Sequence, residues 1–497
     1  MKNNQFSLLG DKRFLPLFIT QFLGAFHDNV FKNALVVLLL YGVVKNTGHD
    51  PKLLVTLAAG IFILPFVLFS ALGGQLADKY SKNNVIRVVK IVEIGIALLG
   101  SAALLSGSVY LSFTTLFALG TQSAFFGPSK YSLLPQQLET HELIGGNALL
   151  NTGTFLAILL GTIVGTILIT LDVGKPLVST LLVLCAICGY LSSRFIPHAA
   201  PKAPTLKLNF NPVTETWDIL RHTFRQQKNV VRAILGVAWF YALGGMFMAQ
   251  FANYTEGTLT ANEHVLAFFL GIFSVGIAVG GLLNHRLLKG RVEAVYVPLA
   301  ILAISIASID LYFAGNVINT TGELLGLSAF LGTLAHWRIV FDVATIAICG
   351  GLFVVPLNAI IQHNIPEDIR ARVLAGSAIM DALFIIGSSI ISAVLIVKGW
   401  EIKEIFLAFA IVNAFVAVYI CTLLPDYLFK SFLQVLFKLI YKVEVRGLAN
   451  FEKAGKRAVI VGNHVSLLDP PLLAAFLPGR PMFAVNSDVA DWIWVKP

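Results

Sequence analysis

The chain has 497 residues, of which 57% are hydrophobic and only 13% are charged, and its mean hydropathy is +0.80. These values exclude a water-soluble globular protein, because so apolar a chain needs lipid as the solvent for most of its length. The net charge of +9 comes from basic residues spread over short loops between apolar runs, which argues against a nucleic-acid-binding face.

Apolar runs long enough to cross a bilayer follow one another along the chain. Since a hydrocarbon core of about 30 Å needs roughly 20 apolar residues in a helix, we predict an all-α membrane protein with about twelve spans. The predicted spans are 14–44, 53–77, 85–106, 109–128, 143–171, 176–196, 230–253, 264–288, 294–315, 339–362, 371–397 and 402–424. Lys and Arg concentrate in the loops on the side of the N-terminus, so the positive-inside rule places both termini in the cytoplasm.

An internal repeat relates the two halves of this pattern. The stretch 23–33 realigns with 243–253, and 135–151 realigns with 366–381. The first span therefore corresponds to the seventh, and the fifth to the eleventh. Such repeats are typical of transporters whose substrate site lies between the halves near the membrane midplane.

The repeat suggests a division of the chain into four parts. We predict an N-terminal six-helix half at 1–196 and a C-terminal six-helix half at 230–425. The stretch 197–229 is polar, contains four prolines and then becomes amphipathic, so we interpret it as a cytoplasmic linker. Residues 426–497 have a different character, described below.

The loop after the second span carries a recognisable motif. Residues 73–82 read Gly-Gly-Gln-Leu-Ala-Asp-Lys-Tyr-Ser-Lys. On Gly74, Asp78 and Lys79 the loop resembles the signature Gly-x-x-x-Asp-Arg/Lys-x-Gly-Arg/Lys of the major facilitator superfamily, although Ser81 stands where the family has Gly. The resemblance implies that Asp78 contacts the other half as a conformational latch. The alternative is an ordinary solvated turn.

The first span contains Asp28, Asn29 and Lys32 in its middle, although a charge at the bilayer centre costs about 2.5–3.5 kcal/mol. Asp28 and Lys32 are four residues apart and share a helix face, so they could simply neutralise each other or tie helices together. We favour a second interpretation, in which both face the central cavity. They would then bind a zwitterionic head group such as phosphoethanolamine, with its phosphate at Lys32 and its ammonium at Asp28.

Further polar residues lie within the predicted spans. Each alone more often joins helices than binds a ligand, but together they favour a polar cavity. The remaining candidates for substrate binding are Asn147, Asn151, Asn253, Asn358 and Asp381. Asp381 is also the best candidate for proton coupling. Gln122 and Lys130 belong to the same set of polar residues within the spans. Glu93, together with Lys90, suggests a salt-bridged gate.

No cofactor or metal site is expected. The four cysteines lie in apolar stretches, and the Cys185-x-x-Cys188 spacing lacks both polar access and further ligands.

The pattern changes after Pro425. An amphipathic segment at 427–441 carries lysines that suit an anionic membrane surface. Strand-like stretches at 443–448 and 458–461 follow and lead into Asn463-His464-x-x-x-x-Asp469.

This last stretch resembles the first motif of the glycerolipid acyltransferases. The resemblance implies that His464 is the general base on a glycerol hydroxyl and that Asp469 orients its imidazole. The family's later motifs would lie beyond Pro497. We therefore expect 426–497 to be the start of an α/β acyltransferase domain that does not catalyse by itself.

With the acyltransferase motif and a first span that reads Phe22-Leu-Gly-Ala-Phe-His-Asp-Asn29, the chain is similar to the bacterial lysophospholipid transporters fused to a 2-acylglycerophosphoethanolamine acyltransferase. The resemblance implies flipping of lysophosphatidylethanolamine and lysophosphatidylglycerol across the bacterial inner membrane to the cytoplasmic leaflet. The fused domain would restore the missing chain, with acyl carrier protein as a candidate donor. His27 departs from the small or polar residue expected there, which leaves the head-group preference open.

Two alternatives remain at this point. A proton-coupled exporter of drugs or small solutes would share the fold and the Asp78 loop, but would not need an acyltransferase. A membrane anchor that transports nothing would explain the fusion, but not the polar residues kept in lipid.

Overall fold

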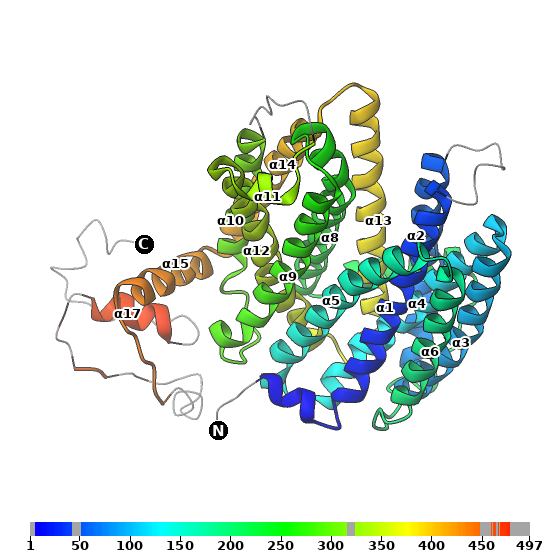
Figure 1. Ribbon diagram of the computed structural model, residues 1–497. Helices are drawn as coiled ribbons and strands as arrows, with labels where there is room; N and C mark the ends of the chain where they lie inside the picture. The colour runs from blue at the N-terminus through cyan, green and yellow to red at the C-terminus, as the bar shows by residue number, and fades with distance from the viewer. Residues whose placement is uncertain are drawn as a thin grey trace.

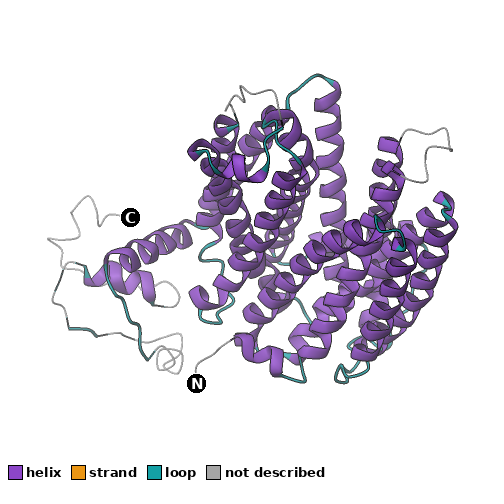
Figure 2. Cartoon of the chain, in the orientation of Figure 1, coloured by secondary structure: helices purple, strands orange, loops and turns teal. Residues whose placement is uncertain are grey.

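The computed structural model describes residues 5–41, 51–315, 324–447, 459, 461–463, 466 and 468–477. They form a bundle of long helices with smaller helices at one side (Figure 1). Eleven of the described helices are long and apolar enough to cross a membrane, which confirms the predicted fold class. The described residues contain no strand, only an isolated bridge between Ala261 and Leu325 (Figure 2).

The described residues of the N-terminal half form six long helices. They are α1 (Leu15–Tyr41), α2 (Pro51–Lys79), α3 (Lys82–Ser106), α4 (Val109–Gln137), α5 (Leu143–Ile169) and α6 (Gly174–Ser193). α1 packs against α5 and α6, and α4 packs against α2 and α3. Short 3-10 turns precede α1 and α5 at Gln5–Gly10 (η1) and Thr140–Glu142 (η3).

The C-terminal half repeats this arrangement. Its long helices are α8 (Lys228–Asn253), α9 (Glu263–Leu288), α10 (Val297–Ala314), α12 (Leu334–Asn364), α13 (Arg370–Val397) and α14 (Ile402–Leu423). α12 packs against α9 and α10, and α8 packs against α13. Aromatic rings pack in the core here, with Phe251 stacked on Phe247 and in edge-to-face contact with Phe273 and Phe406. Two short helices, η4 (Tyr254–Thr258) and α11 (Leu327–Leu331), lie in the connections.

Helix α4 is the twelfth long helix of the bundle, although it is less apolar than the other eleven. It begins where the fourth predicted span begins and extends beyond it to Gln137. Polar residues such as Thr121, Gln122 and Ser123 interrupt its apolar run. They are tolerated because α4 lies inside the bundle, in contact with α2, α3 and α13.

Among the described residues, three further helices lie outside the two halves. The predicted linker contains α7 (Pro212–Phe224), whose N-terminus is capped by the Asn211 side chain and which packs against α2 and α13. After α14 the chain forms the amphipathic α15 (Pro425–Ile440), which runs sideways from the bundle, and then α17 (Asp469–Phe476) (Figure 1).

The two halves meet mainly through α2 with α13 and α5 with α9. The α2–α13 contact depends on Gly74, because a Cβ there would lie 2.7 Å from the Cβ of Ala375 and 2.9 Å from the carbonyl oxygen of Ala371. Only glycine lets the two backbones approach this closely. The contact lies at the end of the bundle that carries Asp78, called here the Asp78 end.

We predict that Gly74→Val destabilises the closed Asp78 end, because overpacking a tight contact costs about 1–3 kcal/mol. Gly95→Val is the matched control, since a Cβ on Gly95 meets nothing within 4 Å. Spin labels at positions 80 and 368, which are both exposed, measure the separation of the halves. Gly74→Val should lengthen this distance and Gly95→Val should not. An unchanged distance distribution in Gly74→Val would show that the glycine is not needed.

Candidate functional site

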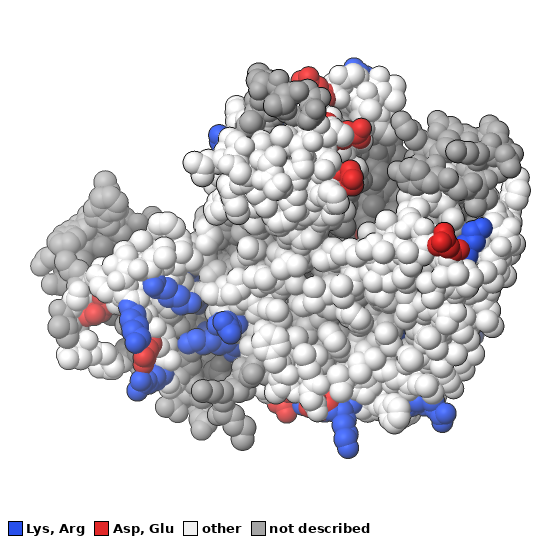
Figure 3. Space-filling view, viewed as in Figure 1, with Lys and Arg blue, Asp and Glu red and all other residues white. Residues whose placement is uncertain are grey.

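A cavity of about 470 Å³ that has charged residues in its lining lies between the two halves. α1 contributes Asp28, Asn29 and Lys32 to its lining, α4 contributes Lys130, and α13 contributes Asp381. The space-filling view shows the molecule hollowed between the two halves at the top, which is the end opposite Asp78 (Figure 3). The structure therefore has its halves closed at the Asp78 end and separated at the other.

The charged residues of α1 turn toward this cavity without pairing with each other. Asp28 accepts a hydrogen bond from Ser123 at 2.9 Å and lies 3.3 Å from Nδ1 of His27. The ammonium group of Lys32 lies 5.6 Å from the centre of the Phe62 ring. Among the ion pairs of the described residues none joins Asp28 to Lys32. The geometry therefore favours two separate anchors over a self-neutralising pair.

Two more lysines line the same cavity. Lys130 donates a hydrogen bond to Gln21 and lies 4.7 Å from the centre of the Tyr131 ring. Lys90 pairs with Glu93 at 2.6 Å, and Gln122 donates to the same carboxylate at 2.6 Å. The predicted Lys90–Glu93 pair thus forms, but Lys90 lies in the cavity wall.

Helix α1 leaves room for this buried cation. A Cβ on Gly24 would lie 2.5 Å from the Lys90 ammonium nitrogen, so a glycine at this point lets Lys90 reach the cavity.

The opposite wall of the cavity carries a carboxylate. Asp381 of α13 lines it together with Asn358 of α12 and Tyr241 of α8, and one carboxylate oxygen of Asp381 has no hydrogen-bond partner among the described residues. The cavity therefore holds three lysines on the N-terminal half, with Asp28 among them and Asp381 facing them. Such a distribution is complementary to a ligand that carries both a negative and a positive group.

Three of the residues predicted to bind substrate lie elsewhere. Asn147 exchanges two hydrogen bonds of 2.9 Å with Gln362 of α12, fully buried between the halves. Asn151 accepts from the Tyr131 hydroxyl at 3.4 Å, behind the cavity lining. Asn253 is exposed at the end of α8, where it donates to Gln250. The structure thus brings together Asp28, Asn29, Lys32, Asn358 and Asp381, but not these three.

The Asp78 carboxylate is fully buried at the α2–α13 contact. It accepts hydrogen bonds from the backbone N–H groups of Ala371 and Arg372 at 3.0 and 3.1 Å, and from Nε of Arg372 at 3.2 Å. These donors form the first turn of α13, where the helix dipole also favours a negative charge. Asp78 therefore binds the other half directly and does not lie in a solvated turn.

The residues around Asp78 reinforce this contact. The Asp78 carbonyl accepts from the N–H groups of Lys202 and Ala203 in the linker. Lys202 in turn forms an ion pair with Glu367, and this hydrogen bond lowers the pKa of Glu367. Ser81 adopts φ −60°, so the glycine usual in the family is not required at that position. Lys79 lies over the Tyr80 ring at 5.8 Å.

Comparison with known proteins places this arrangement in a family. The family model described as Major Facilitator Superfamily matches residues 17–336. The chain belongs to the major facilitator superfamily. A second model, described as Acyltransferase, matches residues 442–497.

The chain is similar to bacterial lysophospholipid transporters. The lysophospholipid transporter LplT of Klebsiella pneumoniae subsp. pneumoniae is 25% identical over 365 residues, which cover 73% of this chain and 83% of that protein. LplT of Cronobacter sakazakii is 26% identical over 367 residues, with the same coverage.

Solved structures of transporters share the fold at low identity. A bacterial homologue of the iron transporter ferroportin in an outward-facing state has a TM-score of 0.62 at 14% identity, covering 82% of this chain and 98% of that one. The human organic anion transporter MFSD10 has a TM-score of 0.62 at 15% identity, covering 81% and 98%.

The acyltransferase motif is described only in part. Asp469 is the first residue of α17, and its carboxylate accepts from the Ser466 N–H at 2.8 Å. His464 lies outside the described residues. The strand predicted at 443–448 does not form over 443–447, because a strand requires a paired neighbour and none lies among the described residues.

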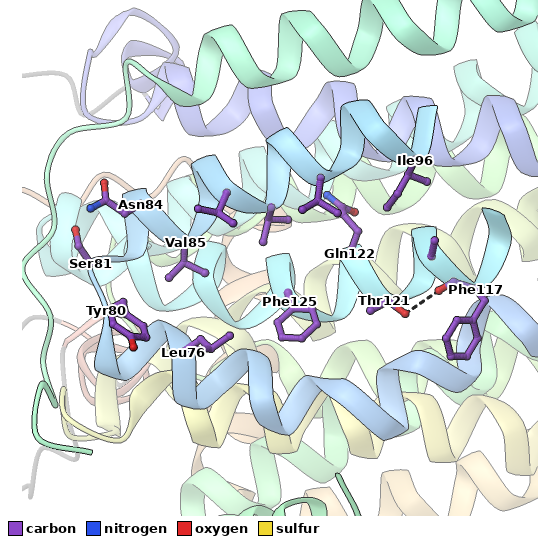
Figure 4. Close-up of a pocket in the computed structure, with 14 residues that line it drawn as sticks. Leu76, Tyr80, Ser81, Asn84, Val85, Ile96, Phe117, Thr121, Gln122 and Phe125 are labelled. Atoms are coloured by element: carbon purple, nitrogen blue, oxygen red, sulfur yellow. Dashed lines mark hydrogen bonds between the residues drawn. The ribbon is translucent and has the colours of Figure 1, made fainter. Parts of the chain in front are cut away.

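A larger cavity of about 740 Å³ lies between α2 and α3, on the side of α4 that faces away from the central cavity (Figure 4). Its lining is almost wholly apolar, with Val85, Phe117 and Phe125 among its residues. Gln122 borders both cavities, but α4 packs tightly against α2 at Gly120 and separates them. Without charged groups the outer cavity does not suit an ionic head group.

The sequence indicates that Lys130 and Gln122 lie within spans but not what they do, and it suggests that Lys90 belongs to a gate. Their positions within apolar runs are a signal of function. The pattern does not reveal which helix face each occupies, since the helices are apolar on most sides.

We predict that Asn147→Ala destabilises the protein by about 1–3 kcal/mol, because it leaves the buried Gln362 amide without its partner. Thermal unfolding in detergent measures this effect. Asn364→Ala, an exposed change two residues along α12, is the control. The double variant Asn147→Ala/Gln362→Ala should lose less stability than the sum of the losses in the two single variants. Strict additivity would mean that the two amides do not interact.

Proposed function

We propose that this protein flips lysophospholipids, lysophosphatidylethanolamine and lysophosphatidylglycerol, across the bacterial inner membrane to the cytoplasmic leaflet. The observation that carries the proposal is the grouping of Asp28 with Lys32, Lys90 and Lys130 in one cavity between the halves. The similarity to transporters named for lysophospholipids supports the same substrate class.

In this proposal the cavity binds both charges of the head group. The phosphate lies between Lys32 and Lys130, and the ethanolamine ammonium lies at Asp28. Asp381 faces this site from the other half and is available either to the ammonium or to a coupling proton. Charge-assisted hydrogen bonds of this kind contribute about 1.5–3 kcal/mol each.

Alternating access then follows from the contacts between the halves. The bonds of Asp78 to the first turn of α13 hold the Asp78 end closed while the cavity faces the other side. Head-group binding at Asp28 and Asp381 draws the two walls of the cavity together and favours breakage of the hydrogen bonds between Asp78 and α13. The single acyl chain stays in the membrane during this movement.

The topology we propose places both termini and the Asp78 end in the cytoplasm, as the distribution of Lys and Arg indicates. Lysophospholipid is then collected from the outer leaflet and released where the segment matching the acyltransferase model lies. Tethering raises the effective concentration of the product for reacylation, with acyl carrier protein as a candidate acyl donor. His464 and Asp469 are the residues we propose for that chemistry. An exporter of drugs or small solutes would leave the acyltransferase match unexplained.

We predict that the full chain in proteoliposomes flips labelled lysophosphatidylethanolamine and that Lys130→Gln slows flipping about ten-fold or more, the equivalent of one lost charge-assisted bond. Lys130→Gln should slow lysophosphatidylglycerol equally, because both lipids carry the phosphate. Asp28→Asn should slow the ethanolamine lipid more than the glycerol lipid, because only ethanolamine carries an ammonium.

Lys228→Gln is the control for charge, since Lys228 is exposed at the start of α8, outside the cavity. Failure of the wild-type chain to move either lipid would reject the proposed function. Equal effects of Asp28→Asn on the two lipids would reject the assignment of the ammonium site.

A further inference from the structure

A third cavity, of about 390 Å³, lies at the Asp78 end of the C-terminal half. Its walls are the first turns of α8, the last turns of α12 and the end of α14. The connection from α9 to α10 and the first turn of α15 complete it. It is separate from the central cavity, because Leu357 of α12 lines this pocket whereas the adjacent Asn358 lines the central one.

The pocket has an apolar floor and a charged rim. Phe353, Leu357 and Ile420 form part of the floor. Arg232, Glu293 and Asp426 lie near the ends of the helices and in the connections, so they form the charged rim.

The lining of the pocket extends along α12 over a length close to the thickness of one leaflet. From Asn364 at the rim to Phe353 in the floor, α12 rises about 16 Å at 1.5 Å per residue. Half of a 30 Å hydrocarbon core is about 15 Å. A polar rim above an apolar floor of this length fits an amphiphile with one chain and a zwitterionic head.

The same part of the structure holds the segment that matches the acyltransferase model. Tyr296, beside the pocket residue Val297, donates a hydrogen bond from its hydroxyl to the Gln434 side chain of α15. Gln434 and Lys430 of α15 donate in turn to the carbonyl oxygens of Ala475 and Leu477 at 2.6 Å each. The pocket and α17 are therefore attached to one scaffold.

The other side of α15 is apolar and exposed. Phe429, Phe432, Leu436 and Leu439 recur at helical spacing and are between 37% and 80% exposed, which is typical of a helix lying in the membrane surface. Lys and Arg gather where α15 meets the bundle (Figure 3). Burial, and secondly the nearby Lys289, lower the pKa of Lys438. This basic surrounding attracts phosphate groups.

We propose that this pocket is a second lysophospholipid site, which holds the flipped lipid beside the acyltransferase segment before reacylation. The acyl chain occupies the floor formed by α12 and α14, the phosphate binds Arg232, and the ammonium binds Glu293 and Asp426. This assignment rests on the proposed function for the identity of the lipid. It adds a place at the transporter–acyltransferase junction where the product of flipping is retained.

The test is photo-crosslinking of the full chain in lipid nanodiscs with a lysophosphatidylethanolamine that carries a photoreactive group on its chain, followed by mapping of the modified peptides. We expect adducts at two places, the central cavity and the junction pocket. Asp28→Asn should remove only the first set. Arg232→Gln should lower only the second set, by about ten-fold, as expected for one charge-assisted bond.

Ile420→Trp should also lower the junction adducts, because it fills the half-buried floor, whereas Val418→Trp on the exposed face of α14 should not. Arg221→Gln, an exposed change in α7, is the control for charge. Circular dichroism and thermal unfolding establish that each variant is folded.

Three results would overturn the proposal: no junction adducts in the wild type, equal adducts in the pocket variants and their controls, or equal labelling by a two-chain phosphatidylethanolamine probe. The flipping assay is independent of this readout. Junction adducts in a protein that does not flip lipid would reject the transport function alone, and flipping without junction adducts would reject only the second site.

Discussion

The constraint on which this structure depends is that lipid offers no partner to a polar group. Each charged residue within the spans must therefore find a partner in the protein or face the cavity. Asn147 is paired with Gln362 across the halves, whereas Asp28, Lys32 and Asp381 line the space between the halves. Lys90 does both, since it pairs with Glu93 and also lines the cavity. The same rule thus separates the buried amides that join helices from the charged residues that face the cavity.

The same constraint governs the contact of Asp78 with α13 when the protein changes conformation. A fully buried carboxylate is stable only while the first turn of α13 supplies its hydrogen bonds, so separation of the halves leaves it without partners until water enters. Gly74 lets the backbones come close enough for these bonds to form. Closure at the Asp78 end is therefore a discrete state, and the cavity opens toward the opposite end while it persists.

The C-terminal segment, with α15 and α17, has a helix of the kind that lies in the membrane surface. α15 presents lysine and glutamine side chains to α17 and an apolar stripe to its surroundings, while Tyr296 ties it to the C-terminal half. A transporter and the segment that matches an acyltransferase model are thereby held side by side, and the pocket at the start of α15 combines a charged rim with an apolar floor.

The sequence by itself determined the membrane class, the order of the spans and the importance of Asp78, because apolar length and a short motif are local properties. It also identified Asp28 and Lys32, since charges within an apolar run are conspicuous. Only the tertiary structure decided that Lys90 and Lys130 share the cavity with Asp28 while Asn147 joins the halves. The physical reason is that the rotation of a helix that is apolar on most sides is set by packing with its neighbours, and its own sequence does not record which face turns inward.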